Sequence, residues 1–154
     1  MAEALHLKAE DEEDLAVISS CLQDALVPLA DMRYEPEARR FTLALNRFRW
    51  EDESGHAAGE AEGAHARTAC GVVFEGVDKV SLKHIDQAKR ERPLELLALV
   101  PDAAAGSGAA GDGAAILLLF AGGGTIRLEC RAIRCRLDDF GETWPTKWQP
   151  RHRA

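Results

Sequence analysis

The stretch that decides the fold runs from Ala115 to Cys130 and reads AILLLFAGGGTIRLEC. Two apolar runs flank three consecutive glycines, which adopt the positive φ angles of a tight turn without steric cost. In the second run Ile126, Leu128 and Cys130 alternate with other side chains, the period of a strand with one buried face. The stretch therefore predicts an antiparallel hairpin within a sheet.

Shorter runs with the same period lie on both sides of this hairpin. They are Met32–Tyr34, Phe41–Leu45, Thr68–Phe74, Lys79–His84, Leu94–Val100 and a last run at Cys135–Leu137. Runs of this length, separated by turn-forming residues, are typical of half-buried strands. A turn at Glu35–Ala38 joins the first two runs, so we expect a second hairpin there. Leu5–Leu7 fits the start of one more short strand.

The inward–outward alternation changes phase twice along these runs. The apolar positions that end at Leu45 resume at Phe48, and this one-residue shift predicts a β-bulge after Asn46. A second shift, between Cys130 and Ile133, predicts either another bulge or a tight turn into the final strand.

One helix is expected, near the N-terminus. Leu15, Ile18 and Leu22 repeat at helical spacing, and Asp11 is a suitable N-cap residue. Because a proline follows, we expect the helix to end within Ala25–Val27. With seven to eight strands and this helix, the predicted class is α+β, with an antiparallel, bulged sheet or a partly open barrel.

The chain of 154 residues has the length of one ordinary domain, and its apolar fraction of 46% is that of a globular protein. We therefore predict a single domain over residues 1–154. Segments 51–67 and 101–114 are rich in alanine and glycine and have few apolar anchors, so they are predicted to be flexible loops.

The formal net charge of −7 disfavours binding to nucleic acid, which requires a positive face. No run of residues is long and apolar enough to cross a membrane, and the acidic N-terminus lacks the order of a signal peptide. We therefore expect a cytoplasmic protein without a membrane partner. In that compartment the four cysteines are expected to be buried free thiols.

Arginines and aromatic residues cluster in one part of the chain. The members that we predict to form a binding surface are Arg39, Arg40, Arg47, Arg49 and Trp50. On a strand, Arg47 and Arg49 share one face, opposite the aromatic side chains that alternate with them. Guanidinium groups bind carboxylate or phosphate, which favours an anion site. The alternative is that the aromatics fill the core while the arginines pair with acidic side chains.

Other reactive residues give weaker signals. Cys130 and Cys135 lack the spacing of a zinc-binding pair, so neither a metal site nor a cofactor is expected. A cysteine nucleophile requires a base such as His84 brought close by the fold. Trp144 and Trp148, four residues apart in a polar tail, are candidates either for an anchor that packs on the domain or for a dimer contact.

Several segments together resemble a known family. They are Glu13–Leu15, Leu22–Ala25, Arg39–Phe41, Asn46–Phe48, Trp50–Glu51, Phe120–Gly124 and Ile126–Glu129. The chain is similar, outside the two loops, to an alphaproteobacterial domain-of-unknown-function family, number twenty-nine forty-eight. The resemblance implies no activity and no catalytic residues. It implies a gene neighbourhood that often includes histidinol dehydrogenase.

Three hypotheses on function follow. The first is a non-enzymatic binding or assembly module that uses the Arg39–Trp50 surface to bind a protein partner or an anionic small molecule, with a homodimer as one form. The alternative is a small enzyme acting on an anionic metabolite, with His84 or a cysteine as the reactive group. The third, which rests on the resemblance alone, is an accessory role in histidine biosynthesis.

Overall fold

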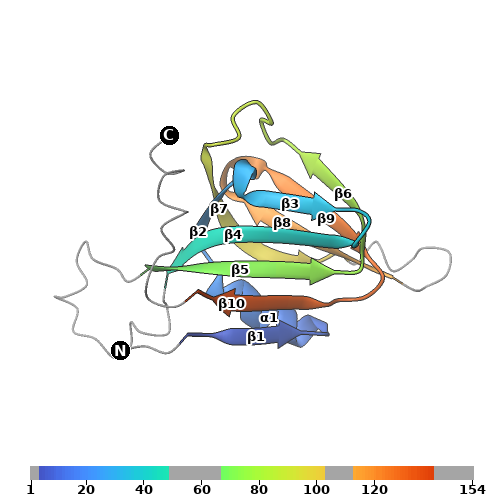
Figure 1. The fold of residues 1–154 in the computed structure, drawn as a ribbon. Coiled ribbons are helices and arrows are strands. Elements are labelled where there is room, and N and C mark those ends of the chain that lie inside the picture. Colours follow the sequence, from blue (N-terminus) through green and yellow to red (C-terminus); the bar gives the residue numbers. More distant parts are fainter. Residues whose placement is uncertain (1–3, 49–66, 103–112, 141–154) are drawn as a thin grey trace.

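A computed structural model describes residues 4–48, 67–102 and 113–140 of the chain (Figure 1). Within them, one helix and ten strands follow one another, with short 3-10 turns at Leu29–Asp31 and Ala121–Gly123. The elements are β1 (His6–Ala9), α1 (Glu12–Cys21), β2 (Ala25–Pro28), β3 (Met32–Glu35), β4 (Arg40–Phe48), β5 (Arg67–Glu75), β6 (Val77–Lys83), β7 (Pro93–Pro101), β8 (Ala114–Phe120), β9 (Thr125–Cys130) and β10 (Cys135–Asp139).

All ten strands belong to one antiparallel sheet that bends strongly and stays open (Figure 1). The strand order is β1-β10-β5-β4-β2-β7-β8-β9-β6, and β3 also pairs with β4. The Tyr34 hydroxyl on β3 donates to the Val77 carbonyl on β6 over 3.0 Å, so the bend brings these two strands close together. Helix α1 packs against β1 and β7. The fold class is thus α+β with an N-terminal helix, as predicted, but with more strands.

The hairpin predicted from Ala115–Cys130 is confirmed. Strands β8 and β9 pair in register, with Ile116 opposite Leu128 and Leu118 opposite Ile126. Gly122 and Gly123 in the turn have φ angles of 89° and 98°, which few side chains tolerate. The second expected hairpin, between β3 and β4, also forms.

The predicted end of the helix is wrong. The N-cap is confirmed, because the Asp11 carboxylate accepts a hydrogen bond of 2.8 Å from the amide of Asp14. The helix nevertheless ends at Cys21, and Ala25–Pro28 forms strand β2, which pairs with β7. The backbone reverses at Asp24, whose φ is 66° and whose amide donates to the carbonyl of Leu96 over 2.7 Å. Pairing with β7 therefore outweighs the helical periodicity of this segment.

The bulge predicted after Asn46 is also wrong. Strand β4 pairs with β5 in unbroken register from Arg40 to Phe48. The alternation continues without a shift, because Arg47 occupies the next interior position after Leu45. The irregularities of the sheet lie elsewhere, at Val77–Lys79 in β6 and at Leu96–Ala98 in β7. The second phase shift, after Cys130, is a turn into β10 and not a bulge, so the second of the two predicted alternatives is confirmed.

The core lies between the inner face of the bent sheet and helix α1, which contributes Leu15, Ile18 and Leu22. No disulfide joins the four cysteines, all of which lie among the described residues. Cys70, Cys130 and Cys135 are buried, as predicted, whereas Cys21 is only half-buried. The loops predicted over 51–67 and 101–114 fall mainly outside the described residues. Of these two ranges, Arg67 belongs to β5, Pro101 to β7 and Ala114 to β8.

Candidate functional site

Arg47 lies in the interior, bound to Asp139 of β10. Its Nε and Nη2 donate to the two carboxylate oxygens of Asp139 over 2.9 and 2.8 Å, and its Nη1 donates to the Phe48 carbonyl over 2.9 Å. Both charged side chains are 0% exposed. Because β5 lies between β4 and β10, this bidentate ion pair connects two strands that are not neighbours.

Asp139 also holds the start of the described chain in place. Its carboxylate accepts a hydrogen bond of 2.9 Å from the amide of Leu5, and its own amide donates to the carbonyl of Leu5. Cys70 is the residue of β5 paired with Asp139, and burial, reinforced by the Asp139 charge, raises the pKa of its thiol. The Arg47–Asp139 pair is thus part of the framework of the sheet.

The other predicted site residues lie apart from Arg47. Arg40, seven residues earlier on β4, points to the outer face and pairs with Glu75 at 3.3 Å and Glu35 at 3.5 Å. Arg39 is exposed and pairs with Asp78 at 3.5 Å. Arg49, Trp50, Trp144 and Trp148 lie outside the described residues. The structure therefore does not bring the described arginines together at one point.

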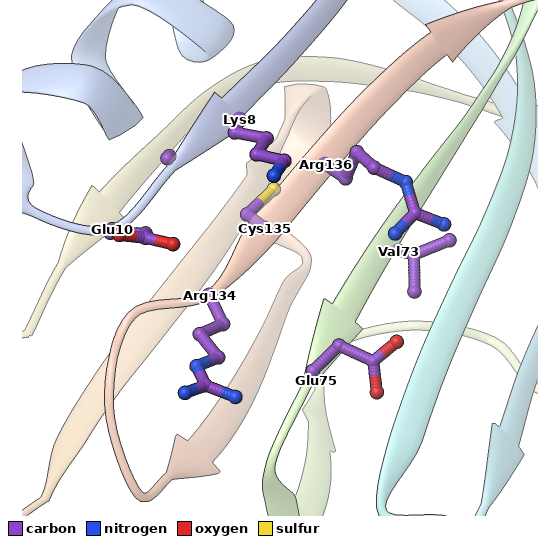
Figure 2. Close-up of a pocket in the computed structure, with 8 residues that line it drawn as sticks. Lys8, Glu10, Val73, Glu75, Arg134, Cys135 and Arg136 are labelled. Atoms are coloured by element: carbon purple, nitrogen blue, oxygen red, sulfur yellow. The ribbon is translucent and has the colours of Figure 1, made fainter.

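A groove of about 360 Å³ opens where β1, β10 and β5 lie side by side (Figure 2). We call it the cationic groove. It is lined by Lys8, Ala9, Glu10, Val73, Glu75, Arg134, Cys135 and Arg136. Figure 2 shows the charged ends of Lys8, Arg134 and Arg136 spread around the groove rather than converging on one point. Such an arrangement suits an extended anionic group better than a single small ion.

Two of these cations are unpaired. Neither Lys8 nor Arg134 has an ion-pair partner among the described residues. Arg136 donates through Nε to Asp138 over 2.9 Å, and Asp138 also pairs with His6 at 2.8 Å. Although burial acts to raise it, the pKa of Asp138 is lowered by these hydrogen bonds and the charge of Arg136.

The groove has no activated nucleophile among its described lining residues. Burial, helped by the neighbouring Cys130, raises the pKa of the Cys135 thiol to about 12. His84 is exposed, has a φ of 60° just after β6, and lines neither this groove nor the one between α1 and β7. In the described part of the chain, no three His, Cys, Asp or Glu side chains gather as a metal site requires.

The cationic groove is not among the sites predicted from the sequence. Its signal is present in the alternation of β10, where Arg136 and Asp138 stand between the buried Cys135, Leu137 and Asp139. Strand β1 places Lys8 opposite Arg136. The pairing of β1 with β10 joins the two ends of the described chain, and alternation within single strands does not predict it.

The fold and the groove define a small α+β domain with an open antiparallel sheet and a charged outer surface. Over residues 5–152 the chain matches the family model described as "Protein of unknown function (DUF2948)", and it belongs to that family. No curated protein and no solved structure matches the chain. Among the described helices, none has the length and apolar character needed to span a membrane.

Proposed function

We propose that this chain is a non-enzymatic binding or assembly module, and that the cationic groove and the adjoining Arg40 contact an anionic group of a partner. The single observation that carries the proposal is the position of Lys8 and Arg134, two unpaired cations on one groove of a chain with a net charge of −7. In so acidic a chain, cations without partners that share a groove favour an anion from outside the domain.

The surroundings of the groove support an acidic protein segment as the partner. Arg136 keeps two guanidinium nitrogens beyond the one that binds Asp138, and Arg40 is 43% exposed beside Glu75 at the edge of the groove. Several separated cations match several carboxylates along a chain better than one compact ligand. Arg39, Arg49 and Trp50 remain part of the proposed surface, whereas the interior position of Arg47 gives it a structural role.

Binding is favoured over the enzymatic alternative by the chemistry of the groove. The raised pKa of Cys135 keeps its thiol protonated at neutral pH, which makes it a poor nucleophile. Four cysteines without a disulfide suit the reducing cytoplasm that we propose as the compartment. We also propose that the chain forms a homodimer with Trp144 and Trp148 at the contact. The variant Trp144→Ala/Trp148→Ala should then sediment as a monomer in a sedimentation velocity experiment.

The test is a titration of the full-length, ¹⁵N-labelled chain with a hexaglutamate peptide, followed by NMR. The largest shifts are expected at the amides of Lys8, Glu75 and Arg136. The variant Lys8→Ala/Arg134→Ala should bind at least about tenfold more weakly, because it removes two hydrogen bonds to a charged group that each contribute on the order of 1 kcal/mol or more.

The matched control is Lys83→Ala/Arg92→Ala, which removes two exposed cations outside the groove. It should change the affinity less than twofold once the ionic strength is held fixed. If both double variants weaken binding equally, the attraction is a diffuse effect of net charge and the groove is not the site. Chemical-shift changes confined to strands that do not line the groove would also show that the groove is not the site.

A further inference from the structure

A second groove, of about 270 Å³, lies between helix α1 and the second half of β7. We call it the helix groove. Its lining residues are Glu12, Ala16, Ser19, Ser20 and Gln23 on the helix side and Leu97, Leu99, Val100 and Pro101 on the strand side. The side chains on the strand side are apolar, and those on the helix side are polar except for Ala16.

The groove exists because β2 stops pairing with β7 at Leu96. Beyond Leu96, no described strand lies on that side of β7, and α1 packs there instead. The amide of Leu99 donates to the Ser19 hydroxyl over 2.9 Å rather than to a strand. Since the N–H and C=O of a strand residue point the same way, the Leu99 carbonyl also faces the groove.

The irregularity in β7 exposes an apolar side chain at this place. The register shift between Leu96 and Ala98 breaks the alternation, so both Leu96 and Leu99 are buried while Leu97 is 42% exposed. Val17 on α1 is 52% exposed but does not line the groove. An exposed leucine beside Val100 and Pro101 gives the groove an apolar wall.

Both ends of the helix groove are acidic. Glu12 and Glu13 lie in the first turn of α1, at one end. At the other end, Asp24 directly follows Gln23, and Glu95 lies two residues before Leu97. None of these four carboxylates has an ion-pair partner among the described residues. A hydrogen bond between the carboxyl groups of Glu95 and Asp24, together with burial and the Asp24 charge, raises the pKa of Glu95. Two carboxyl groups held this close together favour a cation at this end of the groove.

We propose that the helix groove docks an extended segment of a partner protein that has apolar side chains at its centre and a basic residue towards each end. The groove follows α1 from Glu12 to Ser20, about 12 Å at 1.5 Å per residue, and continues to Gln23 beyond the end of the helix. About four to five extended residues span this length. The Leu99 carbonyl offers such a segment a main-chain acceptor. This inference is independent of the cationic groove.

The test measures fluorescence polarisation of a labelled heptapeptide, Lys-Leu-Ser-Leu-Ser-Leu-Lys, with the full-length chain. Leu97→Lys should weaken binding at least tenfold, because it places a cation and its desolvation cost in the apolar wall. Val17→Lys adds the same charge to a neighbouring exposed position outside the lining, and it should change the affinity less than twofold. A peptide with glutamate in place of both lysines should bind at least tenfold more weakly than the original.

Three results would overturn the proposal. The first is no binding of the lysine peptide to the wild-type chain. The second is equal weakening by Leu97→Lys and Val17→Lys, since general attraction to an acidic surface explains that. The third is a wild-type dimer, seen by sedimentation velocity, that Leu97→Lys dissociates and Val17→Lys does not, because the occupant is then a second copy of this chain.

Discussion

Asp138 and Asp139 are neighbours on β10, and they stand in two different environments. The side chain of Asp138 lies on the outer face, is 38% exposed and pairs with His6 and Arg136. The side chain of Asp139 points inward, is 0% exposed and is bound by both sides of the Arg47 fork. Two identical residues thus form an exposed ion pair on the outer face and a buried ion pair in the interior.

The arginines of β4 show the same division. Arg40 is 43% exposed beside Glu75, whereas Arg47, an odd number of residues further on, is buried. The difference teaches that strand parity, rather than residue type, decides which charges of this sheet can meet a partner. Charges on the outer face are available for binding, and those on the inner face hold the strands together.

The largest expected effect is that of Arg47→Ala. The change leaves the Asp139 carboxylate buried without its cation, and breaking such a pair costs about 3–5 kcal/mol of unfolding free energy. Arg40→Ala, on the same strand, should cost less than about 1 kcal/mol, because its ion pairs are exposed. Urea denaturation followed by circular dichroism measures both.

A companion variant separates charge from packing. Arg47→Met/Asp139→Leu removes both charges and keeps apolar volume, so it should recover most of the stability lost in Arg47→Ala. If the double variant is as unstable as the single one, the interior position needs the hydrogen bonds of Arg47 rather than the neutralisation of Asp139.

A second prediction concerns the interior thiols. With a pKa of about 12, about one Cys135 in ten thousand is a thiolate at pH 8, and Cys130 is in the same state. Both should react with iodoacetamide at least about tenfold more slowly in the folded chain than in urea, as followed by mass spectrometry of labelled peptides. Equal rates in both states would mean that this part of the sheet opens freely.

The smallest effect is expected on the outer face. The folded-state pKa of Asp138 is lowered, so its pairing adds stability that is present above the unfolded pKa of about 3.9 and is lost as the pH falls through the folded value. Asp138→Asn should therefore lower the unfolding free energy by less than about 1 kcal/mol at neutral pH. At pH values below the folded-state pKa of Asp138, the variant and the wild type should differ little. A loss that grows towards acid pH would contradict this sign.

Much of the fold is predictable from short segments of the sequence. The glycine turn and the alternation around it place β8 and β9 correctly, and the N-cap at Asp11 is also correct. These features depend on local backbone preferences and on the burial of one strand face. Each of these features can therefore be predicted from one short, continuous stretch of sequence.

The errors arise where distant parts of the chain decide. The helix period continues past Cys21, yet Ala25–Pro28 pairs with β7, some seventy residues away in sequence. The apolar pattern predicts a bulge after Asn46 instead of an interior position for Arg47. The ion pair with Asp139 permits burial of the Arg47 charge, so the strand continues without a bulge. The same limit applies to the cationic groove, since Lys8 and Arg136 meet only through the pairing of β1 with β10.

Double-mutant cycles on two arginine pairs of β4 test the central claim most directly. One cycle takes Arg47 and Asp139 to alanine singly and together, and the other does the same for Arg40 and Glu75. We predict a coupling energy of at least about 2 kcal/mol for the interior pair and less than about 1 kcal/mol for the outer pair. Equal coupling energies would contradict it, because parity on β4 would then not separate structural charges from charges available for binding.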